Sequence, residues 1–323
     1  MKQGLSAFLR VFVSTVLLAG LLFAMRHHLP GVAATLMKTN LAIFFFAVLL
    51  FAINVCVLAV RLRLVFQGEG LLIPYIRTAQ LSFVGYFFNN FMPTAIGGDL
   101  VKAYYAYAQT DQAGKSFVAV FMDRFVGVFS FIVIASIALL CSWNMINSSI
   151  KSAIALFAVA GIVGMVVVLN SRVAGVVLGA LSHLKLFNVG EKLSKVYRMV
   201  HDYRNKKKLL AVAALVSAIV QCSYFIVIFL LGASLGTGLS LRIIFLLMPL
   251  VSLISMLPSI GGLGFREGAI VLLFKDFIGS DNAFAISILL LVILLLTSVI
   301  GAGFYAFAPQ FKFKKRMKLE GNV

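Results

Sequence analysis

The sequence predicts an all-α polytopic membrane protein, because the chain is strongly apolar, carries few charges and repeats long apolar runs. Of its 323 residues, 62% are hydrophobic and only 12% are charged, and the mean hydropathy is +1.07. A soluble domain is only about half apolar. An apolar run of about 20 residues crosses a bilayer as a helix. We therefore expect one integral membrane domain over residues 1–323, with no sizeable soluble domain.

Six apolar runs are predicted to be full transmembrane helices. The first follows Lys2 and Arg10 and could imitate a signal peptide, but no convincing small-residue cleavage site follows it. We therefore expect an uncleaved span there. The six spans cover residues 9–25, 41–60, 116–141, 152–170, 209–232 and 282–307.

Two further apolar segments, 73–109 and 241–277, are interrupted near their middle. Proline removes a backbone donor and glycine loosens a helix, so we expect neither segment to be one continuous helix. Broken backbone at membrane depth survives only where protein or a water-filled cavity satisfies it, and two such breaks in corresponding positions point to a transporter's central site. The residues that make the breaks are Pro93, Gly97 and Gly98 in the first segment, and Pro258, Gly261, Gly262 and Gly264 in the second.

Basic residues orient the chain in the membrane. Half of the 28 lysines and arginines lie in 172–208 and 312–318, and such stretches stay cytoplasmic. Both stretches lie inside only if each broken segment enters and leaves on one side, as a re-entrant pair of half-helices. One pair then opens to the cytoplasm and the other to the opposite face. Repeat 1 (about 41–141) and repeat 2 (about 209–307) thus become inverted repeats, which support alternating access.

The same reasoning places the protein in the inner (cytoplasmic) membrane with both termini in the cytoplasm. Residues 171–208 are expected to form two interfacial helices on the inner leaflet, with a solvated loop as the alternative. The net charge of +18 would suggest nucleic acid in a soluble protein, but here it favours contact with anionic lipid headgroups. We expect membrane lipids as partners and no nucleic acid.

Polar and charged residues adjoin the first break. If a half-helix begins near Gly98, Asp99 is either its N-cap or part of the polar floor of a headgroup cavity. Lys102 follows one turn later on the same face. Asn89 and Asn90 precede the break and are candidates for lining the same cavity.

Arg266 and Glu267 follow the second break, in the first turn of a half-helix expected to begin near Phe265. A helix N-terminus offers free N–H groups and partial positive charge, which attract an anion. Arg266 can grip a phosphate in a bidentate way, so we expect a phosphate site here. Glu267 is a further candidate contact, or it pairs with Arg266.

Asp123 and Arg124 lie within the predicted span 116–141. Charged side chains inside a membrane usually face the bundle interior and pair. Their candidate partners are Asp99 and Glu267. The two residues either brace the first break as a structural ion pair or serve the substrate directly.

Motifs for catalysis, cofactors or metals are absent from the sequence. The chain has no G-x-S-x-G, H-E-x-x-H, P-loop or dinucleotide-binding pattern. Its three cysteines and four histidines show no ligand spacing. We therefore expect no enzyme activity, no cofactor and no metal site.

Three motifs in order resemble a known family. They are Asn90-x-x-Pro93 with Gly97-Gly98-Asp99, then Asp123-Arg124 followed by Gly127, then Pro258 to Glu267. Together, over about 10–307, they resemble the lysylphosphatidylglycerol synthase transmembrane family, also called the flippase-like domain family. The resemblance implies a helical domain that moves a polar lipid between leaflets. The chain ends at Val323 without the soluble synthase domain of the aminoacyl-lipid enzymes, so synthase activity is not expected.

The sequence therefore predicts a translocase of a polar or anionic lipid. Its headgroup would enter a cavity between the two breaks, and rocking of the inverted halves would expose that cavity to each leaflet in turn. Two alternatives remain open: an ion- or proton-coupled transporter of a small anion, and a non-transporting membrane partner of a lipid-modifying enzyme.

Overall fold

The computed structural model describes residues 29–92, 96–141, 206–257 and 262–308, together with single residues or pairs at 151–152, 155–156, 159, 161, 203, 259 and 311. The expected span 9–25, most of 152–170 and most of the basic stretch 171–208 lie outside the described residues. So do three of the expected break residues, namely Pro93, Pro258 and Gly261.

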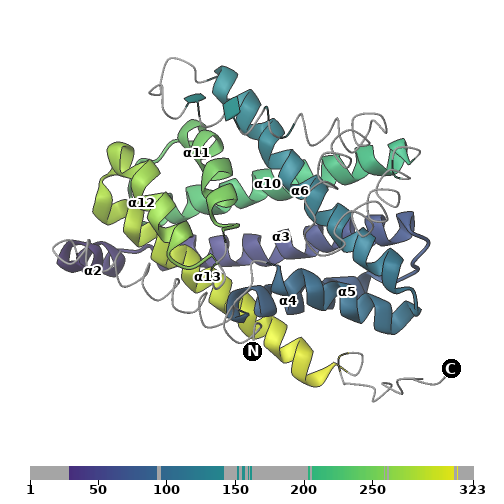
Figure 1. Cartoon of the computed structure of the whole chain (residues 1–323). Helices are drawn as coiled ribbons and strands as arrows, with labels where there is room; N and C mark the ends of the chain where they lie inside the picture. The colour runs from purple at the N-terminus through teal and green to yellow at the C-terminus, as the bar shows by residue number, and fades with distance from the viewer. Residues whose placement is uncertain are drawn as a thin grey trace, which may run out of the picture.

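Within the described residues the fold is built from α-helices (Figure 1). Four of them are 28 or 29 residues long and apolar enough to cross a membrane, and they correspond to four of the six predicted spans. Five shorter helices pack among them. The helices are α2 (Leu29–Met37), α3 (Leu41–Gly68), α4 (Tyr75–Phe91), α5 (Gly97–Thr110), α6 (Ala113–Cys141), α10 (Lys207–Ser234), α11 (Leu241–Ile254), α12 (Phe265–Ile278) and α13 (Ser280–Phe307).

The long helices extend beyond the apolar runs that predicted them. α3 continues past the expected residue 60 to Gly68, which carries Arg61 and Arg63 inside the helix. α10 begins at Lys207, so the last residues of the expected interfacial stretch belong to a long helix instead. The short helix α2 was not expected. Its Val32 packs against Phe284 and Ala285 of α13, and this tertiary contact is invisible in the local sequence.

The same order of helices occurs twice along the chain. A long helix, two short helices and a second long helix form α3–α6, and the same series forms α10–α13. The packing between these two halves is reciprocal: α3 lies against α10, α4 lies against α13, and α11 lies against α6.

The first broken segment is a hairpin of α4 and α5. Gly98 N–H donates to the Oδ1 of Asn89 across the hairpin, at 2.8 Å. A Cβ on Gly98 would collide with the backbone carbonyl of Gly85. Gly97 and Gly98 are thus the first two residues of α5 and not part of the break, which corrects the expectation. Glycine is needed at Gly98 because the two helices approach so closely.

The second broken segment is a hairpin of α11 and α12. Gly262 and Gly264 adopt φ angles of 77° and 86°, in the left-handed region that glycine tolerates best. These two predicted break residues therefore do interrupt the helix. Pro249 lies inside α11 without ending it.

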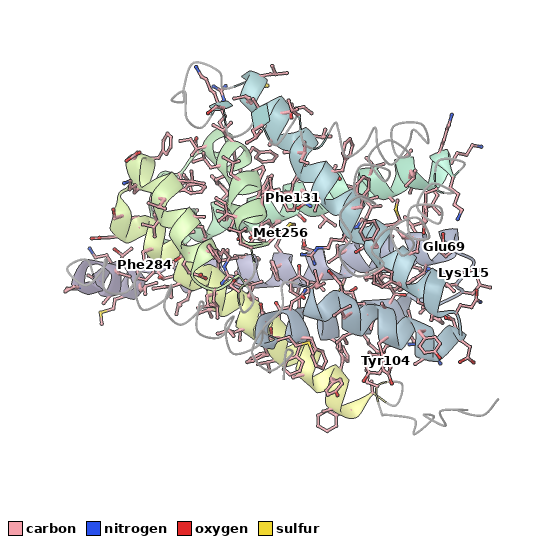
Figure 2. The ribbon with its side chains drawn as sticks, in the orientation of Figure 1. Glu69, Tyr104, Lys115, Phe131, Met256 and Phe284 are labelled. Atoms are coloured by element: carbon pink, nitrogen blue, oxygen red, sulfur yellow. The ribbon has the colours of Figure 1, made fainter. Side chains whose placement is uncertain are left out.

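Buried apolar side chains form two main clusters at different places along the bundle. The larger one packs α10, α11, α12 and α13 against the first part of α3, and includes Phe51, Phe225 and Leu290. The second packs the end of α3 with α4, α5 and α6. In Figure 2, Glu69 and Lys115 lie at one end of the bundle and Phe284 at the other, while Phe131 and Met256 lie between them. The second helix break, which contains Met256, therefore lies in the middle of the bundle.

Candidate functional site

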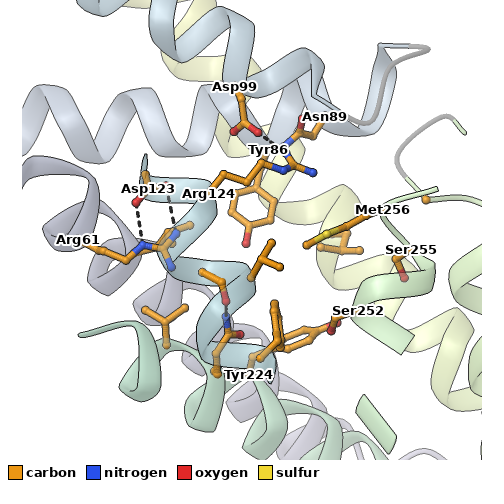
Figure 3. A pocket seen from close by; sticks show the side chains of 18 of the residues that line it. Arg61, Tyr86, Asn89, Asp99, Asp123, Arg124, Tyr224, Ser252, Ser255 and Met256 are labelled. Atoms are coloured by element: carbon orange, nitrogen blue, oxygen red, sulfur yellow. Dashed lines mark hydrogen bonds and ion pairs between the residues drawn. The ribbon is translucent and has the colours of Figure 1, made fainter. Parts of the chain in front are cut away.

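A cavity of about 310 Å³ lies where the two helix breaks meet (Figure 3). Both hairpins and all four long helices contribute to its wall. Seven of the eight polar or charged candidates from the sequence line it: Asn89, Asn90, Asp99, Lys102, Asp123, Arg124 and Arg266. The eighth, Glu267, is buried behind Arg266.

Asp123 is held by a residue that the sequence did not offer as its partner. Arg61 Nε donates to Asp123 Oδ1 at 2.7 Å, and Arg61 Nη2 donates to Oδ2 at 3.1 Å. The second terminal nitrogen of Arg61 donates to Ser217 Oγ at 2.7 Å. Both side chains of the pair are 6% exposed. Arg61 lies one residue beyond the predicted span 41–60, but α3 continues to Gly68 and buries it.

Asp99 forms a cluster with two cations. Arg124 pairs with Oδ2 of Asp99, and Lys102 Nζ lies 3.4 Å from Oδ1. The pairing with Arg124 is one that the sequence offered. Asp99 is the third residue of α5, whose N-cap is Ile96, so Asp99 is not the N-cap. Its carboxylate points instead at the side chain of Arg124 (Figure 3) and also accepts from Lys102 Nζ.

Arg266 and Glu267 form a buried ion pair at the start of α12, which begins at Phe265 as expected. Glu267 also accepts a hydrogen bond from Gly264 N–H at 2.7 Å, so its side chain caps the start of its own helix. The anion beside this helix N-terminus is therefore the protein's own carboxylate. Of the two roles expected of Glu267, the structure shows the pair with Arg266, and a phosphate site at this helix N-terminus stays a prediction. Arg266 still lines the cavity.

Amide side chains join the two halves of the fold around the cavity. Asn90 Nδ2 donates to the carbonyl of Leu294 at 3.1 Å and to Ser298 Oγ at 2.6 Å, so it links α4 with α13. Asn54 Nδ2 donates to the carbonyl of Val220 at 2.6 Å. Gln221 Nε2 donates to the carbonyl of Gly127 at 3.4 Å. Asn54 and Gln221 therefore both form hydrogen bonds between helices.

Several lining residues were not singled out from the sequence. Tyr86 precedes Asn89 and Asn90 by three and four positions, a helical spacing that could have placed all three on one face of α4. Ser252 and Ser255 precede the second break. Tyr224 comes from α10, and nothing in its local sequence marks it.

The lining of the cavity carries more basic than acidic side chains. It contains the four basic residues Arg61, Lys102, Arg124 and Arg266 and the two acidic residues Asp99 and Asp123. Four positive charges less two negative charges leave +2. With Glu267 counted, the excess is +1.

The sequence of this chain is similar to those of known membrane proteins. The family model described as "Lysylphosphatidylglycerol synthase TM region" matches residues 8–302. The chain belongs to this family. It is also similar to the UPF0104 membrane protein PH1989 of Pyrococcus horikoshii, with 24% identity over 284 residues that cover 79% of this chain and 83% of the relative.

The residues that carried the family resemblance are brought together by the fold. Asn90, Asp99 and Asp123 line the cavity, as do Gly127 and Arg266. The first and last of these residues, Asn90 and Arg266, are 176 positions apart in the sequence. This member of the family is therefore a multi-pass helical protein with a charged cavity between its two broken segments.

Proposed function

We propose that this protein moves a polar, anionic lipid between the leaflets of the inner membrane by alternating access at the cavity. The observation that carries the proposal is the convergence of both helix breaks on one cavity with an excess of basic residues. Broken helices that converge on one site are typical of transporters. An excess of positive charge in a site of low dielectric attracts an anion more strongly than it would in water.

In the proposed arrangement the α4–α5 and α11–α12 hairpins are re-entrant and enter from opposite faces of the membrane. Each hairpin is flanked by two long helices that are able to span a membrane. The reciprocal packing of α4 on α13 and of α11 on α6 supports an inverted repeat. Rocking of one half against the other would expose the cavity first to one leaflet and then to the other.

The size of the cavity fits a headgroup and not a whole lipid. A volume of about 310 Å³ is at the lower end of the range of small-ligand sites. The acyl chains would remain in the bilayer, where they keep their apolar surroundings. Arg124 is the most exposed cation of the lining, with 30% of its side chain accessible. We therefore assign the first contact with the lipid phosphate to Arg124.

The proposal is tested by reconstituting the purified protein in vesicles with fluorescent phosphatidylglycerol and measuring the rate of movement between leaflets. We expect the protein to raise this rate over that of empty vesicles. The variant Arg124→Gln removes this cation and leaves Asp99 paired with Lys102, so that no buried charge loses its last partner. Loss of a charge-assisted hydrogen bond corresponds to roughly a tenfold or larger loss of rate.

The matched control is Lys115→Gln, which removes an exposed cation from the same helix at its first turn. It should keep the wild-type rate. If the wild type does not accelerate any anionic lipid, the proposal fails. Uptake of soluble phosphate or glycerol phosphate into the same vesicles, driven by a proton or sodium gradient, would instead support the transport of a small anion.

A further inference from the structure

The cavity has a second, uncharged lining that the proposed function does not use. Besides the ion pairs it is lined by Tyr86, Tyr224, Asn89, Ser252 and Ser255. In Figure 3 the ion pairs of Asp123 and Asp99 lie at the left and top of the view, whereas Tyr224, Ser252 and Ser255 lie at the lower right. The Tyr86 hydroxyl points from its ring toward the space between these two groups.

Both tyrosine rings are fixed by the same buried side chain. Phe51, which is 1% exposed, meets Tyr86 edge-on with ring centroids 5.7 Å apart, and meets Tyr224 at 6.2 Å. Edge-to-face contacts of this kind hold aromatic rings in defined orientations. Tyr86 comes from the first half of the fold and Tyr224 from the second.

The hydroxyls of these tyrosines are available to a ligand. Among the described residues neither Tyr86 nor Tyr224 donates a hydrogen bond to another group, and both line the cavity. The Oδ1 of Asn89 accepts from Gly98 N–H, which leaves its amide N–H groups as donors facing the cavity. The hydroxyls of Ser252 and Ser255 donate to carbonyls of their own helix and retain acceptor capacity.

The carboxylates, by contrast, are already neutralised by the protein. Asp123 pairs with Arg61, Asp99 with Lys102 and Arg124, and Glu267 with Arg266. A headgroup that brought an amine would meet like charges and would find no uncompensated carboxylate among the described residues of the cavity wall. Like charges in a site of low dielectric repel strongly.

We infer that the cavity selects an anionic headgroup made of one phosphate and neutral hydroxyl groups, such as a glycerol or sugar phosphate, and rejects aminoacylated headgroups. The phosphate binds at the Arg124 side, and the hydroxyls bind at Tyr86, Tyr224 and Asn89. This inference rests on the proposed function for the cavity as the lipid site, and it specifies the chemical class of lipid.

Equilibrium binding to the purified full-length protein in detergent tests the inference separately from transport. The probes are phosphatidylglycerol, phosphatidylinositol, phosphatidic acid and lysyl-phosphatidylglycerol, with soluble glycerol phosphate to detect a site for the free anion. We expect lysyl-phosphatidylglycerol to bind at least about tenfold more weakly than phosphatidylglycerol. Equal or tighter binding of the lysyl lipid, or no binding of any of the lipids, overturns the inference.

Replacing the two tyrosines tests the hydroxyl contacts. Tyr86→Phe and Tyr224→Phe keep the ring contacts with Phe51 and so preserve the fold. One neutral hydrogen bond corresponds to roughly a three- to tenfold change in affinity. Each variant should lower the affinity for phosphatidylglycerol and phosphatidylinositol by that factor. The affinity for phosphatidic acid, which lacks the polyol, should not change. Tyr107→Phe, at an exposed position of α5, is the control and should change neither.

The outcomes separate the two proposals. Selective binding without movement of any lipid between leaflets would support the headgroup site and contradict the proposed translocase function. If lysyl-phosphatidylglycerol moves between leaflets as fast as phosphatidylglycerol does, the translocase function is supported and the selectivity for hydroxyl headgroups is contradicted. If both tyrosine variants lower the affinity for phosphatidic acid as much as the affinity for phosphatidylglycerol, the hydroxyls do not bind the polyol and the inference is wrong.

Discussion

Arg61 and Asp123 show how a buried ion pair at the cavity wall depends on both partners. Removing one member of a buried pair leaves an uncompensated charge and typically costs about 3–5 kcal/mol. Removing both leaves no charge to solvate. The pair also holds Ser217 of α10, so it joins three helices.

We predict that Arg61→Gln and Asp123→Asn each lower the thermal stability of the purified protein strongly, by about 3 kcal/mol or more. The double variant should recover a large part of this loss, which a double-mutant cycle in detergent would measure. Additive losses in the double variant would show that the two side chains act independently.

The ion pair of Glu69 with Lys206 is the control for this prediction. Its lysine side chain is 33% exposed, and the N–O distance is 3.0 Å. The Glu69 side chain is 10% exposed, so this pair is less buried than Arg61–Asp123, and Lys206→Gln, which removes the more exposed partner, should have a smaller effect in the same measurement. The contrast tests burial as the reason for the difference.

The sequence-based expectations were most accurate for single residues. Charges in apolar surroundings are rare, so Asp99, Lys102, Asp123, Arg124 and Arg266 could be selected without a structure, and all of them line the cavity. Pairing could not be predicted, because it depends on which helix faces lie opposite one another. Arg61 was therefore missed as the partner of Asp123.

At the scale of the elements, two close helix contacts depend on glycine. A Cβ on Gly98 would collide with the carbonyl of Gly85 between α5 and α4. A Cβ on Gly301 would collide with the carbonyl of Phe83 between α13 and α4. Both obstacles are backbone atoms, so the helices themselves would have to separate.

We predict that Gly98→Ala destabilises the α4–α5 hairpin by about 1–3 kcal/mol, the usual cost of overpacking. Gly268→Ala in the first turn of α12 is the control, because nothing lies within 4 Å of its added Cβ. It should be neutral or stabilising by up to about 1 kcal/mol, since alanine favours a helix over glycine. Thermal unfolding of the two variants in detergent distinguishes them. Equal stability would contradict the close contact.

Gly301→Ala is predicted to separate α13 from α4 and to lower stability by a similar amount, about 1–3 kcal/mol. Gly303, two residues further along α13, meets no atom within 4 Å. Gly303→Ala should therefore leave the unfolding temperature unchanged or raise it. Because this contact joins the two halves, we also expect Gly301→Ala to alter lipid movement. If Gly301→Ala moves lipid between leaflets at the wild-type rate, the close contact of α13 with α4 is not needed for lipid movement.

At the scale of the whole molecule, the proposed re-entrant hairpins fix which loops share a side of the membrane. If α4 and α5 together return to the side from which they entered, the end of α3 and the start of α6 lie on one side. The same holds for the end of α10 and the start of α13 on the opposite side. A hairpin that crossed only once would reverse one of these relations.

Cysteine labelling tests this topology in intact vesicles of known orientation, after replacement of Cys56, Cys141 and Cys222. We predict that Gln67→Cys and Gln112→Cys, both exposed, react with an impermeant reagent from the same side. Ser240→Cys and Asp276→Cys, also exposed, should react only from the other side. Labelling of the first two positions from opposite sides would exclude a re-entrant α4–α5 hairpin.

The sequence by itself determined the membrane class, the long apolar helices, the two interrupted segments and the charged residues beside them. These features follow from local hydropathy and backbone chemistry, which are properties of neighbouring residues. Only the tertiary structure decided that Arg61 neutralises Asp123, that Glu267 caps its own helix, and that two tyrosines from different halves share one cavity. Each of these depends on helix faces that meet across long sequence separations, and a local pattern contains no record of such contacts.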